Sequence, residues 1–165
     1  MPNSKSPNHQ SAQPCSPQAQ QSQVVDAQLF DNQVCFPLYS AANAVTRAYR
    51  PLLDAIDLTY LQYMVMMLLW QHKQMNVKEL GEQMYLDSGT LTPLLKRLEA
   101  KGFVERRRSE LDERVRLISI TEAGLELKFK AQSVPGELAC KADMSPEQAM
   151  ELKRLCQTLL ANLGS

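Results

Sequence analysis

Apolar residues recur at helical spacing in two neighbouring segments near the middle of the chain. Within residues 77–84 they recur every three or four positions, which is the spacing of one buried helical face. Within residues 91–98 four leucines share one face of a second helix. Asp87-Ser88 before this helix is good N-cap chemistry, and Gly102 after it suits the left-handed residue that often ends a helix. These patterns predict a helix, a tight turn and a second helix.

Two short β-prone runs follow the second helix. Residues 103–107 and 114–120 are joined by the polar segment 108–113, which predicts a two-stranded hairpin with a charged tip. A hairpin that directly follows a helix-turn-helix is the arrangement of a winged helix-turn-helix. Because few other segments alternate with period two, we predict a mainly α fold that carries this two-stranded β-wing.

Helical patterns also lie on the N-terminal side of this central unit. Residues 29–56 are typical of a long helix that begins near Asp31, with Pro37 close enough to its start to be tolerated. Residues 59–70 are strongly apolar and contain three methionines, and we interpret them as a core helix on which the central unit packs. By contrast, residues 1–27 are rich in Gln, Ser, Pro and Asn and are predicted to be a disordered tail.

Two more helices are predicted after the hairpin. The first covers about residues 121–133 and is capped at its start by a threonine, and Pro135-Gly136 then marks a break. The second begins with the capping box Ser-Pro-Glu-Gln at residues 145–148 and runs to about Leu163. Apolar positions continue along this last helix, so we expect it to pack against another surface.

One winged-helix domain over residues 28–165 accounts for all of these elements. Its DNA-binding part is predicted at about residues 59–120. The helices at about residues 29–56 and 121–163 remain for dimerisation, because two recognition helices must reach successive major grooves about one helical turn apart. A chain of 165 residues with 44% hydrophobic content is long enough for one such core.

Charge supports nucleic-acid binding only locally. The whole chain has 18 basic and 18 acidic residues, so its net charge indicates no polyanionic partner. Residues 96–116, however, hold eight basic and five acidic residues, a local charge of +3. Such a patch binds DNA in a salt-dependent way, although a solvated hairpin tip explains it about as well when it is taken alone. Beside the helix-turn-helix pattern, DNA binding is the better interpretation.

The chain shows no apolar signal-peptide region and no apolar run of the ~20 residues that a bilayer requires. We therefore expect a cytoplasmic protein with no membrane partner, in a compartment where structural disulfides are rare. None of its four cysteines forms a C-x-x-C pair, and the chain has only two histidines. Neither a metal site nor a cofactor is predicted.

Cys35 lies near the predicted start of the long N-terminal helix. A helix N-terminus carries partial positive charge and unpaired N–H groups, which stabilise a thiolate. Position alone favours a simpler view, in which Cys35 is a small core residue between Val34 and Phe36, since buried free cysteines are common. Cys140 falls at the predicted joint between the two C-terminal helices, and Cys156 lies near the apolar side of the last helix and is most simply core.

From about residue 29 to residue 163 the chain resembles the MarR family of dimeric winged-helix repressors. Asp112-Glu113-Arg114 at the hairpin tip is similar to a wing signature of the whole family. More narrowly, the chain resembles the branch of organic hydroperoxide resistance regulators, in their two-cysteine type. This narrower resemblance is carried by DNQVCFPLY at 31–39, YRPLLDAIDLTYLQY at 49–63, LGEQMYLDSGTLTPLLKRLEAKG at 80–102 and SELDERVRLISITEAG at 109–124.

The resemblance reverses the interpretation of Cys35. In that branch the cysteine of the first helix is the sensing thiol, hydrogen-bonded by tyrosine hydroxyls partly from the other subunit. It implies that Tyr49 and Tyr60 stabilise the Cys35 thiolate, with Tyr39 as a third neighbour. The thiolate attacks the O–O bond of an organic hydroperoxide and becomes a sulfenic acid. Cys140 corresponds to the second cysteine, which closes an intersubunit disulfide and releases DNA.

The resemblance also implies which side chains meet operator DNA. Residues of the second helix face the major groove or touch phosphates, and residues of the wing reach the minor groove, with Asp112 orienting Arg114. The implied DNA-binding set is Ser88, Gly89, Thr90, Thr92, Pro93, Lys96, Arg97, Arg107, Arg108, Asp112, Arg114 and Arg116.

Three hypotheses follow. The first is a homodimeric repressor that is not an enzyme and whose thiol reacts once per signalling event. The second is a regulator of the same family that a non-covalent small acid or phenol releases, with Cys35 as a bystander. The third is a thiol peroxidase, which the absence of a second catalytic constellation and the presence of a basic wing disfavour. The behaviour of Cys35→Ser separates the first two.

Overall fold

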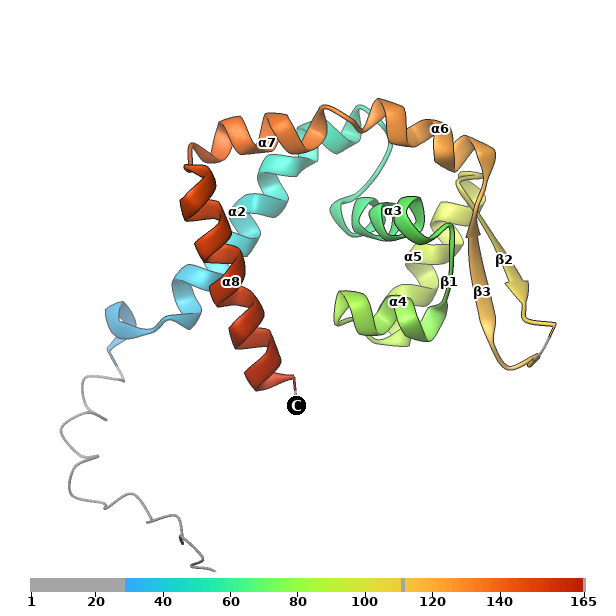
Figure 1. The fold of residues 1–165 in the computed structure, drawn as a ribbon, viewed down its shortest axis with the longest axis horizontal. Helices are drawn as coiled ribbons and strands as arrows, with labels where there is room; N and C mark the ends of the chain where they lie inside the picture. Colours follow the sequence, from blue (N-terminus) through green and yellow to red (C-terminus); the bar gives the residue numbers. More distant parts are fainter. Residues whose placement is uncertain (1–28, 111, 165) are drawn as a thin grey trace, which may run out of the picture. The chain divides into compact units, whose positions relative to one another are not determined.

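The computed structural model describes residues 29–110 and 112–164 (Figure 1). The predicted tail at residues 1–27, with Cys15, lies outside the described residues. The chain divides into two compact units, residues 1–43 and 44–165. Helix α2 (Cys35–Asp54) crosses the boundary between them.

The first unit contains a short 3-10 helix, η1 (Phe30–Asn32), before the start of α2. The prediction of one helix from about Asp31 is therefore wrong at its start, because Gln33 has extended dihedral angles that separate the two elements. The α-helix begins at Cys35, which places Pro37 in its first turn, where the missing N–H has no helical partner to lose.

Three helices form the central part of the second unit: α3 (Tyr60–His72), α4 (Val77–Met84) and α5 (Ser88–Ala100). Each helix begins at an N-cap residue whose side chain accepts the backbone N–H of the residue three positions later, and these N-cap residues are Thr59, Asn76 and Asp87. Gly102 has φ +75, as the sequence predicted for the residue that ends α5. The predicted helix, turn and helix are confirmed.

Three strands form a small antiparallel sheet in the order β1-β3-β2. The hairpin of β2 (Val104–Arg108) and β3 (Arg116–Ile120) pairs Val104 with Ile120 and Arg108 with Arg116, and it is called the wing below. The third strand, β1 (Gln74–Asn76), pairs with β3 and was not predicted. Its three residues carry no β-branched alternation, so only the tertiary pairing reveals it.

The core gathers around α3 and α5. Tyr63, Val65, Met66 and Leu69 of α3 are at most 2% exposed, which confirms α3 as the packing hub. The predicted leucine face of α5 is buried as well, and it lies against the inner face of the wing at Val104 and Ile118. Buried large side chains of this kind supply most of the folding free energy, so the central unit has its own core. The buried leucines of α5 are Leu91, Leu94, Leu95 and Leu98.

The C-terminal part differs from the prediction in two places. It forms α6 (Glu122–Lys130), α7 (Val134–Ala142) and α8 (Pro146–Leu163). The break that was predicted at Pro135-Gly136 lies at residues 131–133 instead, since proline is tolerated in the first turn of a new helix, here α7. Cys140 accordingly lies inside α7 rather than in the joint that precedes α8.

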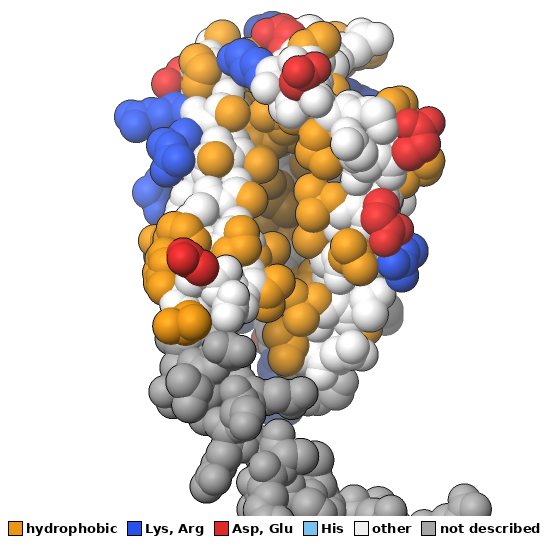
Figure 2. Space-filling view, turned by 90° about the vertical axis from the view of Figure 1, so that its left-hand side faces the viewer, with side chains coloured by type: hydrophobic (Ala, Val, Ile, Leu, Met, Phe, Trp, Pro, Cys, Tyr) orange, Lys and Arg blue, Asp and Glu red, His pale blue; other side chains and the backbone are white. Residues whose placement is uncertain are grey.

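Helix α8 buries none of its side chains in this chain. Figure 2 shows the face that carries α8, on which hydrophobic side chains gather. Cys156, predicted as a core residue, is only half-buried. The most exposed apolar residues of α8 are Met150, Leu152, Leu155, Leu160 and Leu163. Among the described residues, no helix has the length and apolar character needed to cross a membrane.

Candidate functional site

The outward face of α5 carries most of the predicted DNA-binding residues. With its leucines turned to the core, the helix leaves seven of them exposed to solvent. Two of these are the cations Lys96 and Arg97, and among the described residues neither has a carboxylate within 4.0 Å. The exposed set is Ser88, Gly89, Thr90, Thr92, Pro93, Lys96 and Arg97.

Asp87 fixes the N-terminal end of α5. Its Oδ1 accepts the backbone N–H of Thr90 at 2.9 Å, and its Oδ2 accepts the Thr90 hydroxyl at 2.8 Å. These hydrogen bonds lower the pKa of the Asp87 carboxyl, and the bond from the Thr90 hydroxyl has the largest effect. The carboxyl is therefore ionised at neutral pH. The sequence identified this cap but not the second contact, which holds the Thr90 side chain in one orientation.

Pro93 lies inside α5 and removes one helical N–H. The surrounding polar side chains bond to nearby carbonyls: the Thr92 hydroxyl donates to Ser88 O at 2.7 Å, and Arg97 Nε donates to Pro93 O at 3.2 Å. Both bonds are on the exposed face. They hold Thr92 and Arg97 against the helix surface that faces away from the leucines.

The wing carries fewer free cations than the charge count suggested. Arg107 and Arg108 pair with Glu105 at 2.5 Å and with Glu113 at 3.8 Å. Arg106 points back to α5, where its Nε donates to Glu99 Oε2 at 2.6 Å. By contrast, Arg114 and Arg116 are exposed and have no carboxylate within 4.0 Å among the described residues. These two are the cations that the wing offers to a polyanion.

Asp112 organises the tip of the wing. Its Oδ1 accepts the backbone N–H of Arg114 at 2.9 Å, and its carbonyl oxygen accepts the N–H of Val115 at 2.9 Å. The carboxylate thus fixes the backbone at Arg114 and not its guanidinium. A short polar side chain that bonds two residues ahead is the usual way to form such a turn.

An open groove of about 980 Å³ separates the wing from α4 and α5. Leu91 and Leu95 are among the residues that line it. Its charged lining residues are one carboxylate, that of Glu82, and five cations, Lys78, Lys96, Arg106, Arg114 and Arg116. The arrangement presents positive charge from two sides of one concave surface, which favours a polyanion between them.

The predicted sensing thiol lies at the first residue of α2. Cys35 is exposed, so the interpretation as a core residue is wrong. Its Sγ lies 3.8 Å from Gln33 Oε1. Tyr39 follows one helical turn later, is also exposed, and shares a helix face with Cys35 by its spacing of four residues. A thiol in this position is accessible to a small oxidant.

Tyr49 and Tyr60 meet in the second unit. Their ring centroids lie 4.8 Å apart, and Tyr63 adds a third ring 5.8 Å from Tyr49. Burial raises the pKa of both Tyr49 and Tyr60, so each hydroxyl keeps its proton at neutral pH and can donate a hydrogen bond. The sequence missed Tyr63, whose spacing of three residues from Tyr60 was the available signal.

Cys140 lies exposed on α7, and Cys35, Cys140 and Cys156 are all free thiols. Within residues 29–110 and 112–164, no group of three His, Cys, Asp or Glu side chains is arranged to hold a metal ion. The described chain therefore offers two exposed thiols and a basic, grooved surface, on separate elements.

Comparison with known proteins gives consistent matches. The model of the MarR family matches residues 58–115. The chain is 49% identical to the organic hydroperoxide resistance transcriptional regulator of Bacillus subtilis, over 84% of this chain and 94% of that protein. A structure of reduced AbfR bound to DNA has a TM-score of 0.68 and 31% identity, covering 86% of this chain and 96% of that one. A disulfide-formed AbfR has a TM-score of 0.57 and 29% identity, covering 91% and 100%.

Proposed function

The chain belongs to the MarR family, and from this premise we propose that it is a dimeric repressor that leaves its operator DNA when an organic hydroperoxide oxidises Cys35. The family is the one that the sequence motifs predicted. The observation that carries the proposal is the exposed Cys35 thiol at the start of α2 in a relative of a hydroperoxide regulator. The matched proteins are transcriptional regulators rather than enzymes.

The first chemical step uses groups that the chain supplies. The Cys35 thiolate attacks one oxygen of the hydroperoxide, the O–O bond breaks, the sulfur becomes a sulfenic acid, and the other oxygen leaves as an alcohol after taking a proton. The helix N-terminus stabilises the thiolate. Tyr49 and Tyr60 have raised pKa values because they are buried, and they therefore serve as neutral O–H donors to the thiolate, with Tyr39 as a third donor.

The second step closes a disulfide between subunits. The thiol of Cys140 of the partner subunit attacks the Cys35 sulfenic acid, a sulfur–sulfur bond forms and water leaves. Exposure of Cys140 on α7 supports this role, since a buried thiol could not reach another chain. AbfR, a relative by structure, has a disulfide-formed state as well as a reduced state bound to DNA.

The dimer is expected to bury the apolar face of α8. Leu152, Leu155, Leu159 and Leu163 recur at helical spacing on one face of α8 and are all exposed, and a contiguous exposed apolar face of this kind marks a protein–protein contact. Two copies of the α5–wing surface are needed to read two half-sites of one operator. We place this DNA-bound dimer in the cytoplasm.

The proposed function is tested on the wild-type protein with an operator gel shift. Reduced protein should bind a duplex that it selects from a random pool, cumene hydroperoxide should release it, and dithiothreitol should restore binding. The matched control is the corresponding alcohol, which has the same shape without the O–O bond. Release by the alcohol would contradict a redox signal and would favour a regulator that responds to a non-covalent ligand.

The intersubunit disulfide is tested on a non-reducing gel. Wild type treated with cumene hydroperoxide should run as a covalent dimer, and Cys140→Ser should remain a monomer under the same conditions. Cys156→Ser, which removes a half-buried thiol, is the matched control and should cross-link like the wild type. Cross-linking that persists in Cys140→Ser would assign the second thiol elsewhere.

Arg114→Ala should weaken operator binding by about 1–3 kcal/mol, if the guanidinium makes one good specific contact in the minor groove. Arg114 has no carboxylate within 4.0 Å among the described residues, and Asp112 fixes its backbone. The measurement is the anisotropy of a labelled operator at fixed salt. Arg50→Ala removes the same charge from α2, where Arg50 pairs with Asp54, and should bind as the wild type does. Equal affinities of the two variants would remove Arg114 from the DNA surface.

A further inference from the structure

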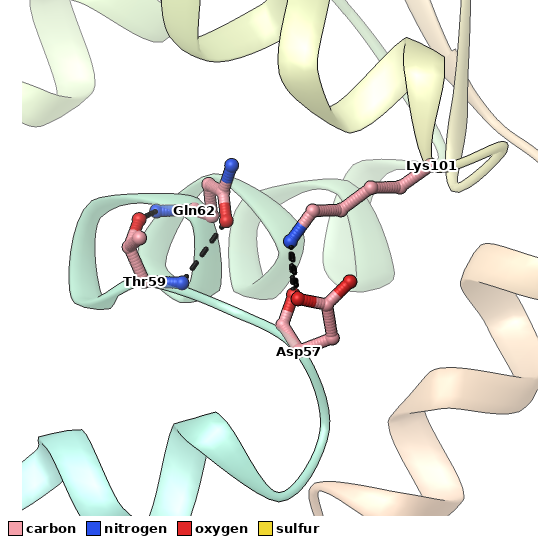
Figure 3. A network of polar contacts seen from close by, with 4 residues as sticks. All are labelled: Asp57, Thr59, Gln62 and Lys101. Carbon is pink, nitrogen blue, oxygen red and sulfur yellow. Dashed lines mark hydrogen bonds and ion pairs between the residues drawn. The ribbon is translucent and has the colours of Figure 1, made fainter.

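A lysine at the end of α5 reaches the connection between α2 and α3, as Figure 3 shows. Lys101 is the C-cap residue of α5, and its Nζ donates to the backbone carbonyl oxygen of Asp57 at 2.5 Å. The same ammonium lies 2.9 Å from Asp57 Oδ1. One cation thus holds both the backbone and the side chain of a residue 44 positions earlier in the chain.

The connection that Lys101 holds is ordered by its own contacts. Asp57 has φ +54, in the left-handed region, and the N–H of the next residue, Leu58, donates to Leu53 O at 3.0 Å. Leu58 is 3% exposed. Thr59 then starts α3 through a capping box with Gln62, whose bonds are drawn beside the lysine in Figure 3. The connection is therefore held by contacts at both of its ends, to α2 through Leu53 and to the first turn of α3 through Gln62.

The two proposed thiolate donors stand on either side of this connection. Tyr49 is on α2 and Tyr60 is the first residue of α3, and their rings pack with centroids 4.8 Å apart. Asp57 lies three residues before Tyr60. The backbone that the Lys101 ammonium binds is therefore continuous with the first residue of α3, whose ring packs on Tyr49.

The exposure of this ion pair indicates that it fixes the position of α5 rather than adding much to the free energy of folding. The Asp57 side chain is 78% exposed, and exposed ion pairs contribute little to stability. Lysine usually extends into water, yet the Lys101 side chain is 26% exposed because it lies along the protein to reach Asp57. Its effect is to tie the end of α5 to one place on the α2–α3 connection.

We propose that Lys101 is a positioning residue, and that its link to Asp57 transmits a change at the Tyr49–Tyr60 pair to α5. The inference rests on the proposed function, which places those tyrosines at the sensing thiol. Without the link, α5 would still bind DNA through the same residues, but oxidation of the thiol would change the affinity for operator DNA less. Such coupling is reciprocal: if oxidation at the thiol weakens DNA binding by some free energy, DNA binding opposes the oxidised state by the same free energy.

The test compares operator affinity before and after cumene hydroperoxide, on full-length dimers. Lys101→Met removes the ammonium and keeps the apolar stem. Asp57→Asn removes the carboxylate while keeping a residue type that tolerates positive φ. In each, the ratio of oxidised to reduced dissociation constants should fall about threefold to tenfold below the wild-type ratio. Lys101→Arg should retain the ratio because it keeps the charge.

Two further measurements separate positioning from a structural role. Arg154→Met is the control: it also removes one cation from an exposed ion pair, the one that Arg154 forms with Glu151 within α8, and it should leave the ratio unchanged. The rate of Cys35 oxidation, followed by thiol labelling, should be the same in all variants. A lower melting temperature with an unchanged or larger ratio would overturn the inference. Wild-type protein that keeps its DNA after oxidation would instead overturn the proposed function, and this inference with it.

Discussion

Cys35→Ser should bind operator DNA as tightly as the reduced wild-type protein and should keep it at hydroperoxide concentrations that release the wild type completely. Serine preserves the size and the helix-terminal position of the side chain. Its hydroxyl is not ionised at neutral pH and does not attack the O–O bond, so the first chemical step is lost. The measurement is the operator gel shift, with mass spectrometry to count the oxygen atoms added to each protein.

The controls make the result specific to one thiol. Cys156→Ser removes a half-buried thiol from α8 and should respond like the wild type. Cys140→Ser keeps the sulfenic acid step and loses only the intersubunit bond. Release of Cys35→Ser by hydroperoxide would move the sensor to another residue. Retention of DNA by both Cys35→Ser and the wild type would show that hydroperoxide is not the signal.

Much of the central unit could be predicted because its signals are local. The leucine periodicity of α5, the Asp87 cap and the left-handed Gly102 each depend on residues within a few positions. The start of α2 was predicted less well, since a 3-10 turn and an α-helix have similar composition. The same limit applies to Pro135, which can end one helix or begin the next.

The site depended on contacts that sequence patterns do not contain. Lys101 and Asp57 are 44 residues apart, and nothing in either neighbourhood indicates their pairing. The local +3 charge of the wing segment also overstated its free cations, because Arg106 turns to Glu99 on α5. The roles of Cys35 and Cys140 came from family resemblance alone, and position in the chain favoured a buried residue for Cys35.

The junction of α6 with the rest of the central unit is close-packed at one glycine. A Cβ on Gly124 would lie 2.2 Å from the backbone oxygen of Phe103 and 2.8 Å from Ile120 Cγ1. Its own carbonyl oxygen accepts the Trp70 indole N–H at 2.8 Å, and its N–H donates to Thr121 Oγ1 at 3.0 Å. Because Phe103 O is a backbone atom, a side chain at 124 can be accommodated only if α6 moves away and strains both bonds.

Gly124→Ala should therefore lower the free energy of unfolding by about 1–2 kcal/mol, which is what remains when the gain in helix preference is subtracted from the upper part of the usual overpacking cost of about 1–3 kcal/mol. Alanine is the better helix former by about 1 kcal/mol, so the steric cost must exceed that gain for the sign to hold. Gly136→Ala in α7 is the matched control, since nothing lies within 4 Å of the added Cβ and the helix preference should act alone. Urea unfolding followed by the fluorescence of Trp70, the single tryptophan, measures both variants. If Gly124→Ala were as stable as Gly136→Ala, α6 could not be packed on Phe103 as closely as this structure has it.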